Sequence, residues 1–334
     1  MYDYIIIGGG IAGIISVSVI YNRYPTAQIL WIDNNNFNSG DLSKYPLVPA
    51  NTPFNVLVYF IEKIYHLLGF ARSISEVCDL TNGNIFKLGC LSKELKIITN
   101  FIRNLKGITM EEDYITKLIS NNNIWTLSGN NNDYIGIKTV LCTGSIHKKL
   151  NYDIPEIPIE TALNHIKLNS LDIKDKHITV FGNSHSGILI LKNLYDMGCM
   201  YITNIIKEKT KIPYFDDNNI EVYQESGIRG EGLNWATANL IPKNKTHIKI
   251  IKFNENNDFK SDFVIYSIGL KPRDIDIIYD GKPFVRRNDF NTTGLLGNNL
   301  YGLGVAYPKF YILNGDIEYE IGMGGFLTRA LEIF

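Results

Sequence analysis

The sequence predicts an α/β protein of two units, in each of which helices pack against a sheet of mainly parallel strands. An apolar segment typical of a buried strand leads into a glycine-rich loop and then a helical pattern, and this succession occurs twice, in residues 4–33 and 177–206. A chain of 334 residues with 45% hydrophobic residues can also form two cores. We therefore expect two similar units within one chain.

The first unit begins with a strand-like segment that runs directly into the spacing G-x-G-x-x-G, formed by Gly8, Gly10 and Gly13. Between a strand and a helix, this spacing is typical of a loop that binds the pyrophosphate of a dinucleotide. Gly8 is expected to make the tight turn, and Gly10 to let the backbone approach the phosphates. Gly13 should let the helix pack close to the strand. The phosphates would bind at the positive end of the helix dipole.

The next strand, residues 28–32, ends at Asp33. An acid at this position is expected to accept hydrogen bonds from the ribose of the adenosine. Asp33 is also followed by Asn34 and Asn35, so a turn-forming role is the alternative.

Helical spacing of apolar residues follows at 54–68 and 92–105. Three short strands separated by Asn-rich turns come next, at 114–119, 124–128 and 133–137. A further apolar strand at 138–142 ends in Thr143 and Gly144, another strand-to-loop junction of the same unit.

The second unit repeats this order, with a strand at 177–181, a helix at 188–197 and a strand at 201–206. Its loop contains Gly182, Ser184, Ser186 and Gly187. The two serine hydroxyls can donate hydrogen bonds to a second pyrophosphate, while small residues in a tight turn are the alternative interpretation. His185 in this loop faces either the nucleotide or the solvent.

Lys207 and Lys209 follow the last strand of the second unit. Cations at this point favour the 2′-phosphate of NADPH, whereas an acid would favour the free ribose hydroxyls of NADH. A solvated run of charges is the alternative. The lysines favour NADPH, although NADH stays open.

Pro155 and Pro158 indicate the crossing into the second unit, and the apolar strand 262–269 indicates the return. A strand at 299–305 and a helix at 323–333 complete the first unit. We expect two Rossmann-like, three-layer dinucleotide-binding domains, the second inserted into the first. The discontinuous domain would contain residues 1–150 and 260–334, and the inserted domain residues 151–259.

The composition excludes several classes of function. A net charge of −1 gives no basic surface for nucleic acid. Glycines interrupt the apolar run at 4–20, so no membrane segment is expected. The four cysteines are far apart, without the spacing of a zinc site or a local disulfide, and the histidines show no ligand spacing, so no metal is expected. Unpaired cysteines are typical of a reducing, cytoplasmic compartment.

The order of the motifs resembles the flavoproteins with two dinucleotide-binding domains, which include thioredoxin reductases, glutathione-reductase-like enzymes and flavin-containing monooxygenases. The resemblance covers nearly the whole chain and implies a flavin ring at the domain junction. It implies FAD binding by Gly8, Gly10, Ala12, Gly13, Asp33, Thr143, Gly144, Gly304 and Gly324. It implies NAD(P)H binding by Gly182, Ser184, Ser186, Gly187, Lys207 and Lys209.

Within this superfamily the sequence departs from the disulfide reductases. It has no redox cysteine pair. The reductases end their third segment with Gly-Asp, whose Asp binds the ribityl chain of FAD, whereas this chain has Gly304 and Val305. A valine side chain cannot accept that hydrogen bond.

Three segments resemble the flavin-containing monooxygenases instead. Their second loop often has Ser in place of the middle glycine, as at Ser184. Residues 159–165 resemble a degraded form of their fingerprint, of which His165 is retained. Residues 49–53 resemble the Asn-Thr segment that lies against the flavin, which implies that Asn51 is near the C4a position where oxygen adds.

The sequence therefore predicts an FAD-dependent NAD(P)H oxidoreductase. The favoured activity is that of a monooxygenase, which passes hydride from NADPH to FAD and then uses oxygen on a small nucleophilic substrate. The first alternative is an electron-transfer reductase acting on a quinone or a partner protein. The second is a degenerate FAD-binding module without activity. A small-molecule substrate or electron acceptor is expected as partner, with no nucleic acid and no membrane, and a homodimer stays open.

Overall fold

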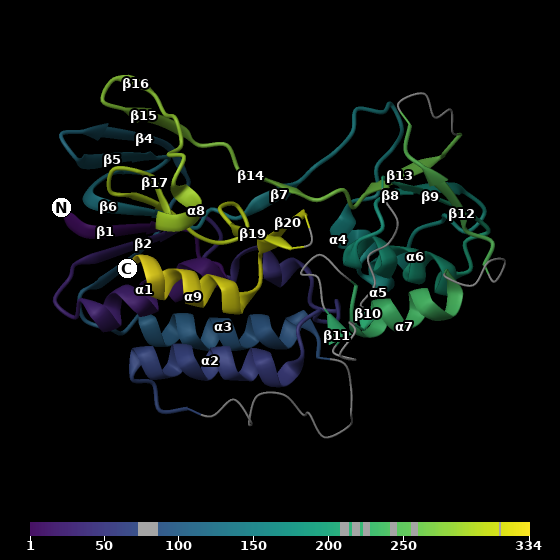
Figure 1. Ribbon diagram of the computed structural model, residues 1–334, viewed down its shortest axis with the longest axis horizontal. Coiled ribbons are helices and arrows are strands. Elements are labelled where there is room, and N and C mark those ends of the chain that lie inside the picture. Colours follow the sequence, from purple (N-terminus) through teal and green to yellow (C-terminus); the bar gives the residue numbers. More distant parts are fainter. Residues whose placement is uncertain are drawn as a thin grey trace.

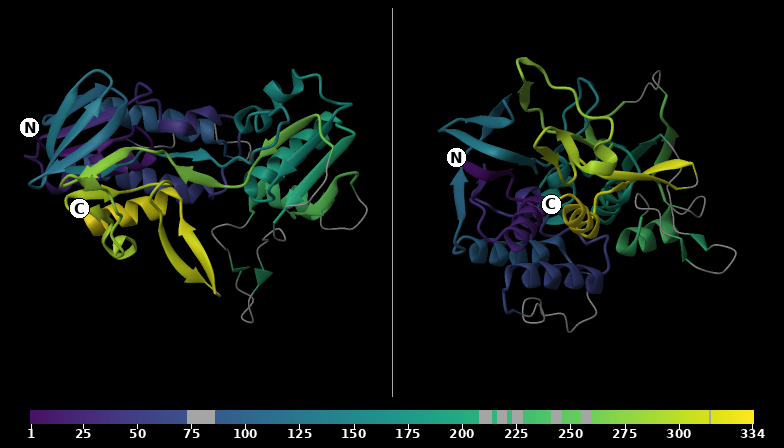
Figure 2. Two further views of the ribbon diagram at one scale, coloured as in Figure 1. Left: turned by 90° about the horizontal axis from the view of Figure 1, so that it is seen from above. Right: turned by 60° about the vertical axis from the view of Figure 1, so that its left-hand side comes forward.

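The computed structural model shows two α/β domains at the two ends of an elongated molecule, with two strands crossing between them (Figures 1 and 2). The described residues are 1–72, 86–207, 214–215, 221–222, 228–240, 246–254, 260–313 and 315–334. Each domain has Rossmann-like parallel strands, and the second is inserted into the first, as the sequence predicts.

The first domain is centred on a parallel sheet. Its strands, in spatial order, are β3 (Ile108–Glu112), β2 (Ile29–Asp33), β1 (Tyr2–Ile7), β6 (Asp133–Leu141) and β18 (Leu300–Gly302). Residues 4–7 of β1 and residues 29–32 of β2 are buried and apolar, as expected for a sheet that is covered on both faces. One face carries α1 (Ile11–Arg23), α2 (Phe54–Leu68), α3 (Leu88–Ile102) and α9 (Met323–Ile333), below the sheet in Figure 1.

The other face carries an antiparallel meander of β4 (Ile115–Asn121), β5 (Ile124–Gly129) and the first half of β6. We expected separate strands at 133–137 and 138–142, and the structure joins them into the single strand β6. Five donors converge on the buried carboxylate of Asp113 and fix the loop between β5 and β6. They are the backbone N–H groups of Tyr114, Asn130, Asn131 and Asn132 and the hydroxyl of Tyr134.

The second domain has a smaller parallel sheet. Its strands, in spatial order, are β12 (Lys249–Lys252), β9 (Tyr201–Ile206), β8 (His177–Phe181) and β13 (Phe263–Tyr266). The helices against it are α4 (Ile159–Ala162), α5 (His165–Asn169), α6 (His185–Met197) and α7 (Gly230–Asn239). Buried aliphatic side chains of α6 and β8 form the centre of this second core.

The expected return to the first domain at residue 260 needs a correction. Strand β13 pairs in parallel with β8, with Phe263 opposite Ile178, so residues 263–266 belong to the inserted domain. The chain returns through β14 (Leu270–Pro272), which pairs antiparallel with the outgoing strand β7 (Ser145–His147). An apolar strand followed by a glycine is compatible with either sheet, so the sequence pattern alone did not show to which domain residues 263–266 belong.

The remaining elements are smaller. They are the 3-10 helix η1 (Gly40–Lys44), α8 (Phe290–Thr293), β10 (Tyr214–Phe215), β11 (Glu221–Val222), β15 (Asp276–Tyr279), β16 (Lys282–Pro283), β17 (Leu295–Gly297), β19 (Lys309–Leu313) and β20 (Asp316–Glu320). In the ranges given above, no helix combines the length and the hydrophobicity that a bilayer crossing requires.

Candidate functional site

A cavity of about 1350 Å³ lies at the carboxyl ends of the first domain's parallel strands and extends to the second domain. Loops after three strands of the first sheet line it, at residues 8–12, 33–35 and 142–145. The second domain contributes His185 and Ser186, among others. In open α/β sheets, this edge is where ligands bind.

The geometry of the first glycine loop explains its spacing. Gly8 has φ +116°, and a side chain there would collide with the carbonyl oxygen of Cys142. A side chain at Gly13 would collide with the carbonyl of Gly8, so helix α1 can approach β1 this closely only with glycine. At Gly10 the nearest atom to an added Cβ is 3.7 Å away, in Gly40. Gly10 therefore keeps space free beside the cavity, whereas Gly8 and Gly13 serve packing.

The second glycine loop has the same geometry. Gly182 has φ +98°, and a Cβ on Gly187 would stand 2.6 Å from the carbonyl oxygen of Gly182. Ser184 stands at the position of Gly10, and the two have nearly the same backbone angles, φ −73° and ψ −175° against φ −84° and ψ −171°. The serine therefore fits this loop without strain, as a small residue with an added donor.

A side-chain donor from the second strand holds each loop. Trp31 Nε1 donates to the carbonyl of Gly8 at 2.9 Å, and Asn204 Nδ2 donates to the carbonyl of Gly182 at 2.9 Å. Trp31 and Asn204 occupy equivalent positions, since each lies opposite the residue two before its glycine. The sequence did not reveal this correspondence, because Trp and Asn differ in size and polarity and have only a side-chain N–H donor in common.

Asp33 lies at the cavity with a side chain that is 5% exposed. Oδ1 accepts from the backbone N–H of Gly9 at 2.7 Å. Oδ2 accepts from the N–H groups of Asn35 at 3.1 Å and Phe37 at 2.8 Å. The carboxylate thus ties the glycine loop to the turn after β2, which fits the turn-forming role, while the ribose role stays a prediction.

The equivalent of Asp33 in the second domain is Ile206, two residues after Asn204. Lys207 is exposed just beyond it and does not line the cavity. Lys209 lies outside the described residues. Neither Gly182, Ser184 nor Gly187 lines the cavity, whereas Ser186 does.

The other predicted FAD residues divide into two groups. Ala12, Thr143, Gly144 and Gly304 line the cavity, and Gly304 adopts φ +96° beside Ala12. Gly324 does not line it. A Cβ at Gly324 would collide with the ring of Phe60 on α2, so this glycine allows close helix packing, and its FAD role stays a prediction. Gly322, the N-cap of α9, lies at the cavity instead.

Asn51 also lines the cavity, in the segment before α2. The backbone of this segment is fixed, since Ala50 N–H donates to the carbonyl of Phe86 at 2.7 Å and Leu88 N–H donates to that of Val48 at 2.9 Å. By contrast, His165 is exposed at the start of α5 and does not line the cavity, whereas Ile159, Glu160 and Leu163 of the same segment do.

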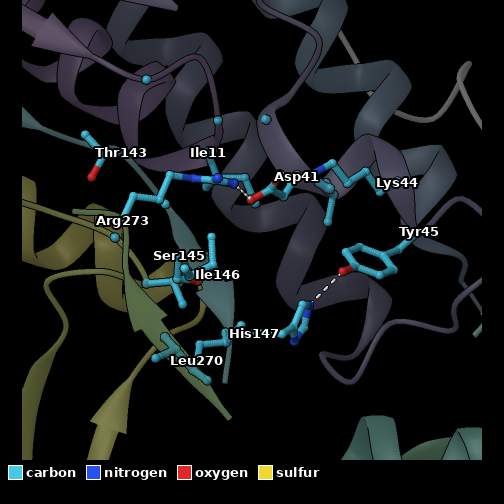
Figure 3. A pocket seen from close by; sticks show the side chains of 18 of the residues that line it. Ile11, Asp41, Lys44, Tyr45, Thr143, Ser145, Ile146, His147, Leu270 and Arg273 are labelled. Atoms are coloured by element: carbon cyan, nitrogen blue, oxygen red, sulfur yellow. Dashed lines mark hydrogen bonds and ion pairs between the residues drawn. The ribbon is translucent and has the colours of Figure 1, made fainter. Parts of the chain in front are cut away.

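Two polar pairs in the cavity were not predicted from the sequence (Figure 3). Tyr45 and His147 share a hydrogen bond of 2.9 Å between the hydroxyl and Nε2. Burial raises the pKa of Tyr45 to about 12 and lowers the pKa of His147, so both groups are neutral near pH 7. Arg273 forms an ion pair with Asp41. No sequence spacing marks either pair, because each joins residues more than 100 positions apart.

Two glycine loops of equal geometry that open on a shared cavity define a protein with two dinucleotide-binding domains. The profile of the pyridine nucleotide-disulphide oxidoreductases matches residues 2–290, and the chain belongs to this family of FAD- and NAD(P)-dependent oxidoreductases.

Individual relatives carry different activities in their names. A protein named monooxygenase AgnR1, from Paecilomyces divaricatus, is 21% identical, over 97% of this chain and 94% of that protein. Among solved structures, bacillithiol disulfide reductase Bdr from Staphylococcus aureus aligns with a TM-score of 0.62 at 15% identity, covering 99% of this chain and 96% of its own. A flavin monooxygenase variant from Stenotrophomonas maltophilia aligns with a TM-score of 0.62 at 12% identity and the same coverage. These structural similarities show a shared fold.

Proposed function

We propose that the protein is an FAD-dependent NAD(P)H oxidoreductase of the monooxygenase kind, acting on a small nucleophilic substrate. The observation that carries the proposal is one cavity lined by the glycine loop of the first domain and by His185 and Ser186 of the equivalent loop in the second. When bound, FAD would supply the redox chemistry, as hydride acceptor from NADPH and as reductant of oxygen. The protein's own residues bind, orient and enclose the two nucleotides.

The first domain offers a site that fits FAD. Gly10 leaves open space beside the loop. The first hydrogen bond of α1 runs from Ile14 N–H to the carbonyl of Gly10, so the N–H groups of residues 11–13 lack partners within the helix. These groups and the helix dipole attract phosphate. Thr143, Gly144 and Gly304 extend the polar backbone surface along the same wall.

The second domain offers a site that fits NADPH better than NADH. Ser184 and Ser186 add hydroxyl donors to the loop. Ile206 replaces the acid that would bind a free ribose, so no carboxylate at this position repels a 2′-phosphate. Burial lowers the pKa of His185, which therefore adds a neutral ring to the cavity wall near pH 7.

The junction favours a monooxygenase over a disulfide reductase. Cys90, Cys142 and Cys199 are free thiols, and Cys78 lies outside the described residues. Burial raises the pKa of Cys142, which lines the cavity, to about 12, so its thiol is a poor nucleophile near pH 7. Asn51 stands on a fixed segment of the cavity wall, where its amide can hydrogen-bond to a bound ring.

A reductase of quinones is the second candidate, and the Tyr45–His147 pair favours it. Reduction of a quinone carbonyl to a hydroxyl requires a proton as well as electrons. The tyrosine hydroxyl, hydrogen-bonded to a neutral histidine in the cavity, is a donor of the kind that such a step uses.

Stopped-flow mixing distinguishes these functions. The full chain with bound FAD is mixed with NADPH without oxygen, and bleaching of the flavin absorbance is recorded. Oxygen is then added with an organic sulfide, or a quinone is added without oxygen. Oxygenated sulfide in proportion to the NADPH consumed supports the monooxygenase. Fast reoxidation by quinone, with only peroxide formed in oxygen, supports the reductase. Bound flavin that NADPH does not bleach would contradict both and favour a module without activity.

The variant Gly10→Val provides the control for FAD binding. Its backbone angles suit any residue, and the loop has room for the Cβ, so the fold should remain. The added side chain would occupy the space kept for the phosphates, and FAD should no longer bind. Normal FAD binding by this variant would remove the basis of the first-domain assignment.

A further inference from the structure

Three charged side chains form a cluster on the cavity wall, which we call the Asp41 cluster: Asp41, Lys44 and Arg273. Arg273 Nη2 lies 2.6 Å from Asp41 Oδ2, and Lys44 Nζ lies 2.7 Å from Asp41 Oδ1. All three residues line the cavity (Figure 3). Asp41 and Lys44 belong to η1, whereas Arg273 directly follows β14 on the crossing that returns from the second domain.

The Asp41 cluster stands beside the first glycine loop. Gly40 packs so tightly on Gly10 that an added Cβ would be 2.9 Å from the Gly10 Cα. On the other side, a Cβ on Gly144 would be 3.7 Å from Asp41 Oδ2 and 3.9 Å from Arg273 Nε. The cluster therefore spans the gap between the loops after β1 and β6, close to the start of α1.

The charges of this cluster do not balance. Two cations surround one carboxylate, so these three side chains carry a net charge of +1 close to the start of α1, where the Asp33 carboxylate is already bound to the N–H of Gly9. Although burial alone would raise it, the pKa of Asp41 is lowered by Lys44 and Arg273, so the carboxylate is ionised near pH 7. A cation near a helix N-terminus is unfavourable unless an anion is bound there. The guanidinium also has five donors, of which an Nη2 hydrogen is directed to Asp41.

We propose that Arg273 and Lys44 bind the pyrophosphate of the dinucleotide held by the first domain, and that Asp41 is a positioning residue that aims Arg273 across the loop. The planar guanidinium can bind phosphate oxygens through two N–H groups while it keeps its contact with Asp41. The proposal rests on the proposed function, since it assigns further residues to the same FAD site. It makes phosphate, rather than the flavin ring, the part of the ligand that these residues recognise.

The test compares FAD with riboflavin, which has the same ring and no phosphate. The full chain is freed of flavin and titrated with each ligand by flavin fluorescence. Arg273→Met should weaken FAD binding by about 10- to 100-fold, as expected for a lost charge-assisted contact, and leave riboflavin binding unchanged. Arg287→Met is the matched control, because Arg287 also pairs with an aspartate, Asp289, at 2.8 Å, and does not line the cavity. It should change neither affinity.

Two further measurements separate binding from structure. Arg273→Lys keeps the charge without the planar fork, so its FAD affinity should lie between those of the wild type and Arg273→Met. If the methionine variant does not fold, the lysine variant alone should show weaker FAD binding than the wild type and unchanged riboflavin binding. The loss of FAD affinity with rising salt should be shallower in Arg273→Met than in the wild type.

The contrary results are distinct. Equal weakening of FAD and riboflavin in both Arg273 variants would show a purely structural role and overturn the proposal. Unchanged FAD binding in Arg273→Met would overturn it while leaving the proposed function intact. A wild-type chain that binds no FAD would overturn both.

Discussion

Replacement of Asp33 by Asn tests what the carboxylate at the end of β2 does. In the structure it accepts from three backbone N–H groups, those of Gly9, Asn35 and Phe37, at 2.7, 3.1 and 2.8 Å. Its 5% exposure gives water little access to replace a lost bond. An amide has one acceptor oxygen, so it can serve either Gly9 or the two turn residues, and its NH2 group must face the other side.

The expected cost follows from this count. A hydrogen bond to a charged acceptor contributes about 1.5–3 kcal/mol, and the amide loses one or two of them. We expect Asp33→Asn to destabilise the flavin-free first domain by about 3 kcal/mol, which lowers its melting temperature by roughly 6–12 °C. FAD affinity should fall as well, because Gly9 belongs to the phosphate-binding loop.

Thermal unfolding of the flavin-free chain, followed by FAD titration, measures both effects. The control is Asp289→Asn, an exposed acid paired with Arg287, which should leave the unfolding transition and the affinity unchanged. If Asp33→Asn unfolds like the wild type while FAD binding weakens, the reasoning from the backbone contacts is refuted, and the carboxylate serves the nucleotide alone.

Three other substitutions test features of the fold. Asn204→Leu removes the side-chain donor to the carbonyls of Val180 and Gly182, and should destabilise the second domain by about 2 kcal/mol. Calorimetric titration should show weaker NADPH binding and an unchanged FAD affinity. Burial raises the pKa of Glu94 from 4.5 in the unfolded chain to about 7. The free energy of unfolding, measured with urea, should therefore fall by up to ~3 kcal/mol as pH rises between these two values. Glu94→Gln should flatten this dependence on pH, and a variant with the same dependence as the wild type would contradict the role of Glu94. Burial alone would raise the pKa of Asp113, but hydrogen bonds from Tyr134, Tyr114, Asn131 and Asn132 lower it, so the stabilisation by this carboxylate is present at neutral pH and lost as pH falls through the lowered pKa. Asp113→Asn should cost about 2 kcal/mol at pH 7 and progressively less in acid, and an equal cost at both pH values would contradict this account.

The bounds of elements with a clear periodic spacing of apolar residues could be predicted from the sequence. The structure confirms the helix at 54–68, the strand at 201–206 and the closing helix at 323–333. Helix α3 begins at Leu88 rather than at residue 92, because backbone bonds from Leu88 to Val48 and from Gly89 to Pro46 hold its first turn. Such support from a distant segment leaves no trace in local periodicity.

The site was predictable where it depends on local geometry. The glycine loops and Asp33 are set by the strand-to-helix turn, so their spacing was informative. The Asp41 cluster and the Tyr45–His147 pair form only because the crossings run past η1, and no residue pattern records that path. Gly324 shows the opposite limit, since a glycine that serves packing and one that serves a ligand look alike in a sequence.

The crossings β7 and β14 form a two-stranded ribbon rather than two separate tethers, with Ser145 opposite Pro272 and His147 opposite Leu270. Stretching or splaying such a ribbon breaks its hydrogen bonds, whereas two-stranded ribbons tolerate wide variation in twist. The second domain should therefore rotate about the long axis of the β7–β14 ribbon while its distance from the first domain stays constant. A pair of fluorescent labels, one on each domain near the axis, would then report a constant separation while the orientation between them changes.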